Sequence, residues 1–205
     1  MKSHPSQSRE VRGPGRQISI DLLALDLDTC GRCVGSLTNI ETAIELLRPA
    51  LEAIGTEVRV RKILITSEEQ ARRHRFASSP TIRIDGRDIV LETRESECAA
   101  CTDLCGCEEG TSCRVWPYRG QEHTEAPVEL IVEALLQQVS GPEAREVAAP
   151  AYPGVPANLR RFFAGRARHD VAAAACCSPA EQAECCEAGE KASCCGVQND
   201  SCGCH

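Results

Sequence analysis

Apolar residues recur along the first two thirds of the chain at two spacings, which predict alternating strands and helices. The apolar-rich run over 17–26 is short enough to be a buried strand. From Leu37 to Ile54 the apolar residues return every three or four positions, which is typical of one face of a helix. Gly55 predicts the end of this helix, and Pro49 predicts a kink within it.

The following residues complete an α/β pattern. Residues 57–65 predict a second strand, and Ser67 and Gln70 have the spacing of a capping box that opens a short helix. The remaining elements are a hairpin, whose strands 81–84 and 88–91 flank a type I′ turn at Asp85-Gly86, and a closing helix over 127–139. The predicted order is therefore β-α-β-α-β-β-α, an α/β fold with a parallel strand pair followed by a hairpin.

Composition divides the chain into five segments. We predict a disordered leader over 1–16, the α/β domain over 17–140 with a cysteine-rich insertion at 97–114, a linker over 141–157, and a cysteine-rich tail over 158–205 with a short helix at 158–165. Beyond Asp170 the tail has almost no large apolar side chains. It cannot bury enough surface to offset the entropy of ordering, so we expect it to be disordered.

Charge and cysteine content narrow the class of protein. The formal net charge of −7 argues against nucleic acid or an anionic membrane as the partner. The first residues lack the apolar core of a signal peptide, and no stretch is long enough to span a membrane, so we expect a cytoplasmic protein. In a reducing compartment, fifteen cysteines at close spacings indicate metal binding or redox chemistry more than a disulfide framework.

Cys30 and Cys33 follow the first predicted strand and open the first predicted helix. A helix N-terminus presents N–H groups and a positive dipole end, both of which stabilise a thiolate. We therefore predict that Cys30 is a nucleophile, that Cys33 is the thiol that resolves a mixed disulfide, and that Arg32 favours the thiolate. The alternatives are that both cysteines are metal ligands or simply buried thiols.

Together these motifs resemble the thioredoxin superfamily. The resemblance lies in the strand, Cys30-Gly31-Arg32-Cys33, the long helix with Pro49, the next strand and helix, and Ser79-Pro80 before the hairpin, and it covers residues 17–140. It implies a cis-proline at Pro80 beside the cysteine pair, and a thiol reductant or a partner protein disulfide as reactant. Asp28-Thr29 stand where the family has a tryptophan before the first cysteine, and the insertion is a second departure.

The insertion has the spacing of a metal site. Thiolates two or three residues apart can surround one tetrahedral ion, and zinc is the first expectation. An iron–sulfur cluster is the weaker expectation, because the fixed ferredoxin spacings are absent. The alternative is a loop held by disulfides or carrying redox thiols. His123 is expected to be a surface residue. The candidate ligands are Cys98, Cys101, Cys105, Cys107 and Cys113.

The tail repeats adjacent cysteine pairs every nine residues. Clustered soft thiolates suit soft acceptors such as Cu(I), Zn, Cd, Hg or trivalent arsenic, and the pairs resemble the tails of several bacterial arsenic-handling proteins. A metallothionein-like store and a passive tail are the alternatives. No organic cofactor is expected. The candidate ligands are Cys176, Cys177, Cys185, Cys186, Cys194, Cys195, Cys202 and Cys204.

Two hypotheses from different classes follow. In the first, the chain is a thiol–disulfide oxidoreductase of the thioredoxin type that handles a soft metal or metalloid, such as arsenite or mercury, with its tail as a capture segment. In the second, it is a non-enzymatic metallochaperone or sequestering protein, in which every cysteine group supplies ligands for zinc or copper.

Overall fold

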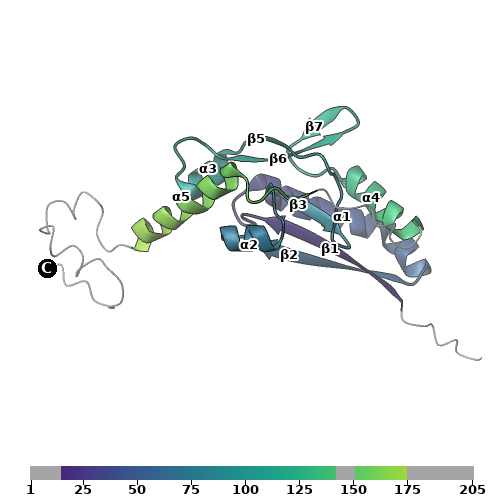
Figure 1. Cartoon of the computed structure of the whole chain (residues 1–205). Helices are drawn as coiled ribbons and strands as arrows, with labels where there is room; N and C mark the ends of the chain where they lie inside the picture. Colours follow the sequence, from purple (N-terminus) through teal and green to yellow (C-terminus); the bar gives the residue numbers. More distant parts are fainter. Residues whose placement is uncertain (1–14, 142–150, 175–205) are drawn as a thin grey trace, which may run out of the picture. The chain divides into compact units, whose positions relative to one another are not determined.

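The computed structural model describes residues 15–141 and 151–174, which form two compact units. The first unit combines residues up to 64 with 79–94 and 114–151, and the second combines 65–78, 95–113 and residues from 152 onward. Figure 1 labels the elements of both units. The predictions for residues 1–14, 142–150 and 175–205, which include most of the leader, the linker and the eight cysteines of the tail, lie outside the described residues.

A four-stranded mixed sheet is the framework of the first unit. Its strands are β1 (Arg16–Ala24), β2 (Thr56–Leu64), β3 (Thr81–Ile84) and β4 (Arg87–Asp88), in the order β2-β1-β3-β4. β1 is parallel to β2 and antiparallel to β3, so that Ile20 is paired with Val60 on one side and with Ile84 on the other. Because alternate residues of a strand face one side, Ile18, Ile20 and Leu22 of β1 supply buried side chains to one core.

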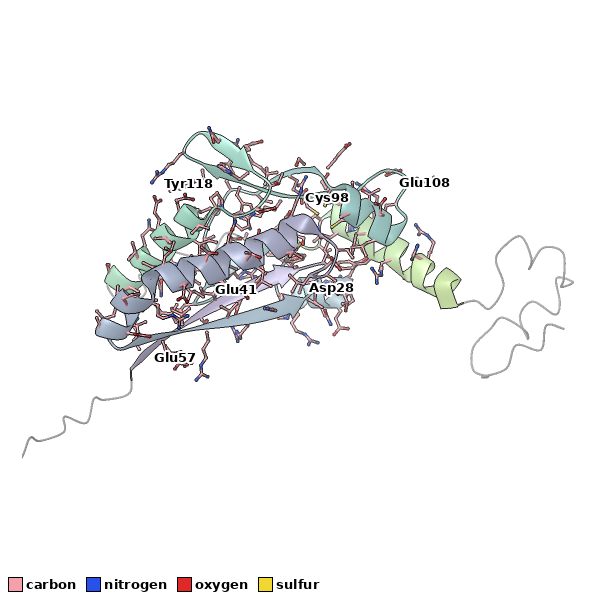
Figure 2. All side chains as sticks on the ribbon, turned by 180° about the vertical axis from the view of Figure 1, so that it is seen from behind. Asp28, Glu41, Glu57, Cys98, Glu108 and Tyr118 are labelled. Atoms are coloured by element: carbon pink, nitrogen blue, oxygen red, sulfur yellow. A yellow bond between two sulfur atoms is a disulfide. The ribbon has the colours of Figure 1, made fainter. Side chains whose placement is uncertain are left out.

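Two long helices pack against each other in the same unit. They are α1 (Gly31–Ala53) and α4 (Val128–Ser140). Asn39 Nδ2 of α1 donates to the carbonyl oxygen of Ala126 (2.9 Å), and the N–H of Ala126 donates to Ser36 Oγ (3.1 Å), so the entry to α4 is tied to α1. Glu41, labelled in Figure 2, lies on the exposed side of α1 and forms an ion pair with Lys62 of β2 (3.7 Å).

The core of this unit is aliphatic with one tryptophan. The fully or nearly fully buried members are Ile18, Ile20, Leu22, Ile40, Ala43, Ile82, Ile84, Trp116, Ala126, Ile131 and Leu135. Trp116 belongs to β6 (Ser112–Tyr118), which pairs in antiparallel fashion with β7 (Gln121–His123), and β5 (Arg94–Glu97) precedes them. The side chain of Arg114 is only 1% exposed, and its guanidinium lies 4.6 Å from the centre of the Trp116 ring. An ion pair with Asp88 (2.8 Å) compensates the buried positive charge.

The second unit is helical. It contains α2 (Glu68–Arg73), α3 (Ala99–Cys105) and α5 (Ala157–Ala174), with α5 packed along α3 and also touching α2. Tyr152 Oη donates to the carbonyl oxygen of Phe76 (3.2 Å). Asn158 pairs with the backbone of Ser112 through both its oxygen (3.2 Å) and its nitrogen (2.7 Å), which fixes the start of α5.

The predicted α/β fold class is confirmed, and the seven predicted elements occur in order as β1, α1, β2, α2, β3, β4 and α4, but β5, α3, β6 and β7 between β4 and α4 were not predicted. Two local details are also confirmed. Ser67 is the N-cap of α2 and its Oγ accepts from the N–H of Gln70 (3.2 Å), as the capping box predicts. Asp85 and Gly86 both have positive φ, +47° and +79°, as a type I′ turn requires. Pro49 lies inside α1, which continues to Ala53. None of the helices in the two described stretches is both long and apolar enough to cross a bilayer.

Two predicted boundaries are wrong. The hairpin strand predicted at 88–91 ends at Asp88. The backbone of Val90 is bonded to side chains instead of to a neighbouring strand, because its N–H donates to Asp88 Oδ1 (3.0 Å) and its carbonyl oxygen accepts from Arg114. The tail helix predicted at 158–165 continues to Ala174. Burial of Leu159, Phe162 and Phe163 anchors its first half, and the alanines that follow have the highest helix propensity.

Candidate functional site

Cys30 lies at the junction between the loop that follows β1 and the first turn of α1. It is the N-cap of α1, and its carbonyl oxygen accepts from the N–H groups of Cys33 and Val34, both at 3.0 Å. Cys30 and Cys33 therefore lie on the same first turn. Both side chains have 0% exposure, and both remain thiols. The sequence placed this pair correctly at a helix N-terminus but did not indicate its burial.

The loop before Cys30 is organised by one carboxylate. Asp26 Oδ2 accepts from the backbone N–H groups of Asp28 (3.2 Å), Thr29 (2.7 Å) and Cys30 (2.6 Å), and from Thr29 Oγ1 (3.0 Å). Partial burial raises the pKa of Asp26, but these hydrogen bonds to the charged form outweigh it, and the net effect is a lowered pKa. The negative charge of Asp26 therefore helps to hold Cys30 in position.

Ser79 joins the cysteine pair to the sheet. Its side chain is fully buried, its Oγ accepts from the N–H of Leu25 (3.0 Å), and the same oxygen lies 3.4 Å from Cys33 Sγ. Its carbonyl oxygen accepts from the N–H of Arg114 (2.7 Å). The Ser79–Pro80 peptide bond is cis and directly precedes β3. Within the first unit the structure thus brings the residue before Pro80 into contact with the cysteine pair.

The Cys33 thiol keeps its proton. A hydrogen bond with Cys30, burial, and the negative charge that Cys30 carries when ionised all raise the pKa of Cys33 far above its ordinary value, while the hydrogen bond with Ser79 lowers it. A buried thiolate beside a second thiolate would lack compensation, so only one of the two sulfurs can ionise readily.

A second set of thiols lies within the helical unit. Cys98 is the N-cap of α3, and Cys101 lies one turn further along this helix, with the two Sγ atoms within 4.8 Å of each other. Cys113 of β6 brings its Sγ to 3.3 Å from that of Cys101. All three side chains are buried (Cys98 5%, Cys101 and Cys113 0% exposed). The N–H of Cys98 donates to the carbonyl oxygen of Thr111 (2.8 Å), which closes the loop between α3 and β6. Figure 2 shows Cys98 at the start of α3.

Cys105 and Cys107 form a disulfide at the end of α3. Gly106 between them caps the helix in the left-handed conformation (φ +57°), which glycine adopts without a steric penalty. Cys105 Sγ lies 3.3 Å from Thr111 Oγ1. Of the five cysteines in this segment, two are thus covalently paired and three remain thiols.

Comparison with known proteins assigns the chain to a family. The model of a domain of unknown function, DUF2703, matches residues 17–135, which is more than half of the chain. The chain belongs to the DUF2703 family. No curated protein and no solved structure matches it. The matched region of this DUF2703 domain contains both sets of thiols described above.

The DUF2703 domain therefore carries buried cysteines that could hold a metal ion, and Cys98 and Cys101 belong to this group. Cys113 Sγ lies 3.3 Å from Cys101 Sγ and is a further candidate ligand. Their residue types and their proximity are those of a site for a thiophilic ion. In the oxidised form Cys105 and Cys107 are bonded to each other and unavailable as ligands. His123, expected at the surface, is the last residue of β7 and half-buried.

Sequence reasoning missed three polar residues of the DUF2703 domain that organise these thiols, namely Asp26, Ser79 and Thr111. A signal for Asp26 was present, because an aspartate shortly before a helix start is a common acceptor for N–H groups. The roles of Ser79 and Thr111 had no comparable signal. Each contacts a cysteine that is distant in sequence or on another element.

We expect Ser79→Ala to lower the free energy of unfolding by about 1–3 kcal/mol, because it leaves the buried N–H of Leu25 unpaired. It also removes the contact that lowers the pKa of Cys33, so that thiol becomes still harder to ionise. Urea unfolding of the reduced protein measures the first effect. Ser140→Ala, the same change at an exposed position in the last turn of α4, is the control and should change stability little. Equal effects of the two substitutions would contradict the role given to Ser79.

Asp26→Asn should weaken the acid sensitivity of folding. The folded-state pKa of Asp26 is lowered, so its contribution to stability is present above the unfolded-state pKa, near 4, and is lost as pH falls through the lower folded value. Wild type should exceed the variant in stability at pH 7 by more than at pH 3. Urea unfolding at the two pH values checks this, with Asp28→Asn as the control on the same loop. A pH-independent difference would overturn the electrostatic account.

Proposed function

We propose that the protein binds thiophilic metal or metalloid ions at its buried thiols and performs dithiol–disulfide chemistry at Cys30 and Cys33. The observation that carries the metal-binding part is the position of Cys101, whose Sγ lies within 4.8 Å of Cys98 Sγ and 3.3 Å from Cys113 Sγ inside the helical unit. A buried thiolate is costly unless a cation compensates its charge. A bound ion supplies that compensation, and thiolates select soft or borderline ions.

Zinc is the ion we propose for this group, and trivalent arsenic or mercury are the soft ions that we propose the protein handles. The sequence of the tail supports the proposed handling of arsenic or mercury, because its eight cysteines include three adjacent pairs at nine-residue spacing. Two neighbouring pairs at this spacing together contain four cysteines, enough to supply three thiolates to one ion. The proposal assumes the reducing cytoplasm, in which such thiols stay reduced.

The redox part rests on the arrangement of the cysteine pair. Cys30 is at the N-terminus of α1, where the helix dipole favours an anion, and Cys33 retains its proton. Attack by a Cys30 thiolate on a small disulfide would form a mixed disulfide and release one thiolate. Cys33 would then give up its proton and attack Cys30 Sγ, which closes the Cys30–Cys33 disulfide and releases the second thiolate. A dithiol reductant would restore the two thiols.

The metal-binding part predicts that zinc protects Cys113 from alkylation. Reduced full-length protein is treated with a limiting alkylating reagent in the presence of zinc or of a chelator, and peptide mapping measures modification of Cys113. Zinc should slow the modification in wild type, because Cys113 shares the ion with Cys98 and Cys101. The protection should disappear in the Cys98→Ser/Cys101→Ser variant.

The control removes the same number of thiols elsewhere. Cys176→Ser/Cys177→Ser leaves Cys98, Cys101 and Cys113 in place, so zinc should still protect Cys113 in that variant. Modification of Cys113 in wild type at the same rate with zinc and with chelator would contradict the proposed metal site.

A second candidate is a non-enzymatic metal-binding protein in which every cysteine group supplies ligands. The observation that favours it is the complete burial of Cys30 and Cys33, because a disulfide on a protein surface cannot reach a sulfur with 0% exposure. A buried dithiol suits a small ion better than a macromolecular partner. Under this alternative, Cys30 and Cys33 bind an ion and catalyse no reaction.

Turnover of a small disulfide separates the two functions. With dithiothreitol as electron source, the enzyme-like function predicts catalysed reduction of 5,5′-dithiobis(2-nitrobenzoate) that Cys30→Ser abolishes and that Cys176→Ser/Cys177→Ser preserves. The binding function predicts no dependence on Cys30, and zinc should instead protect both Cys30 and Cys33 from alkylation. Absorbance of the released thiolate and peptide mapping give the two readouts.

A further inference from the structure

The disulfide at the end of α3 lies directly beside the proposed metal ligands. Cys98, Cys101 and Cys105 occupy positions i, i+3 and i+7, which lie on one face of a helix. Cys101 and Cys105 are one turn apart, a spacing at which two side chains of a helix can bind the same ion. The disulfide with Cys107 therefore takes away from this face the sulfur that would be its fourth ligand.

We infer that the Cys105–Cys107 disulfide is a redox switch of the metal site in the helical unit, an inference that rests on the proposed metal binding. When the disulfide is reduced, Cys98, Cys101, Cys105 and Cys113 provide the four thiolates of a tetrahedral zinc site. When it is closed, only three remain. Closure thus weakens the binding of zinc, while a three-thiolate set remains for an ion that prefers three ligands.

Cys105 is buried beside a residue that is itself tied to another proposed ligand. Its side chain is 1% exposed, and its Sγ lies 3.3 Å from Thr111 Oγ1. Thr111 is held in turn, because its N–H donates to Thr102 Oγ1 (2.8 Å) and its carbonyl oxygen accepts from Cys98 (2.8 Å). The residue beside Cys105 is thereby fixed to the backbone of another proposed ligand.

The two sulfurs of the disulfide differ in accessibility. Cys107 is partly exposed, whereas Cys105 is buried. The side of Cys107 that faces α5 is closed. Its Sγ lies 3.8 Å from the carbonyl oxygen of Arg161, and a Cβ at Gly165 would come within 2.8 Å of it. An external thiolate therefore reaches Cys107 Sγ from the exposed side and has no access to Cys105 Sγ.

The chemistry of opening balances with a dithiol as reductant. One thiolate of the dithiol attacks Cys107 Sγ, the Cys105–Cys107 bond breaks, and its electron pair leaves on Cys105 Sγ as a thiolate. The second thiolate of the dithiol then attacks the mixed disulfide and releases the Cys107 thiolate. The reductant becomes a cyclic disulfide, two electrons enter the protein, and zinc neutralises the Cys105 thiolate. Closure is the reverse reaction with a disulfide oxidant.

The test compares zinc binding before and after closure of this disulfide. The readout is the zinc concentration that gives half-maximal protection of Cys113 from alkylation in the full-length protein, and peptide masses confirm the state of Cys105 and Cys107. In wild type this concentration should rise by about tenfold or more on oxidation, because a ligand of the site is lost. Cys105→Ser should show the weak binding under both conditions.

Cys107→Ser is the matched control, since it retains Cys105 but cannot close the disulfide. Exposed to the same oxidant, it should keep the zinc dependence of reduced wild type. An unchanged zinc concentration in wild type after closure, or an equal loss in oxidised Cys107→Ser, would overturn the switch and leave the metal site intact. Absence of zinc protection in every reduced form would instead refute the proposed function.

Discussion

The buried hydrogen bonds of Ser79 are the constraint on which the arrangement of the cysteine pair depends. One oxygen atom accepts from the end of β1 and contacts Cys33, and the carbonyl group of the same residue accepts from the start of the Arg114 segment. Three segments that are far apart in sequence are thereby fixed to a single residue. A buried hydrogen bond adds modestly to stability, but an unpaired buried N–H is expensive, so this geometry is strongly preferred.

Burial of thiols is the second theme, and its consequence is electrostatic. Outside the disulfide, the five cysteines of the described residues are at most 5% exposed. An apolar environment opposes the ionisation of a thiol, whereas a helix N-terminus or a cation favours it. The first unit offers the helix N-terminus at Cys30, and the second offers a geometry in which several sulfurs can share one cation. The same residue type therefore lies in two different electrostatic settings in the two units.

In the cysteine-rich insertion, local sequence indicated which chemistry the residues could perform but not which of them are in contact. Its spacing predicted ligand-type thiols and also left open a disulfide. A disulfide joins Cys105 and Cys107, and Cys101 and Cys113 are neighbouring thiols. Nothing local indicated that Cys113 would return to Cys101, since that contact depends on β6 running back past α3. The hairpin of β6 and β7 was equally hidden, because Arg114 and Pro117 interrupt the alternation that marks a strand.

The sequence by itself determined the order of β1, α1, β2, α2, β3, β4 and α4, the helix N-terminus at Cys30, the capping of α2 and the turn at Asp85-Gly86, because periodicity and capping are local properties of the chain. Tertiary structure alone decided which thiols are buried, which sulfurs meet, and that Ser79 and Thr111 contact them. These outcomes depend on contacts between residues up to 54 positions apart, as for Leu25 and Ser79. Such contacts arise from packing of whole elements, and no spacing of residues along the chain specifies them.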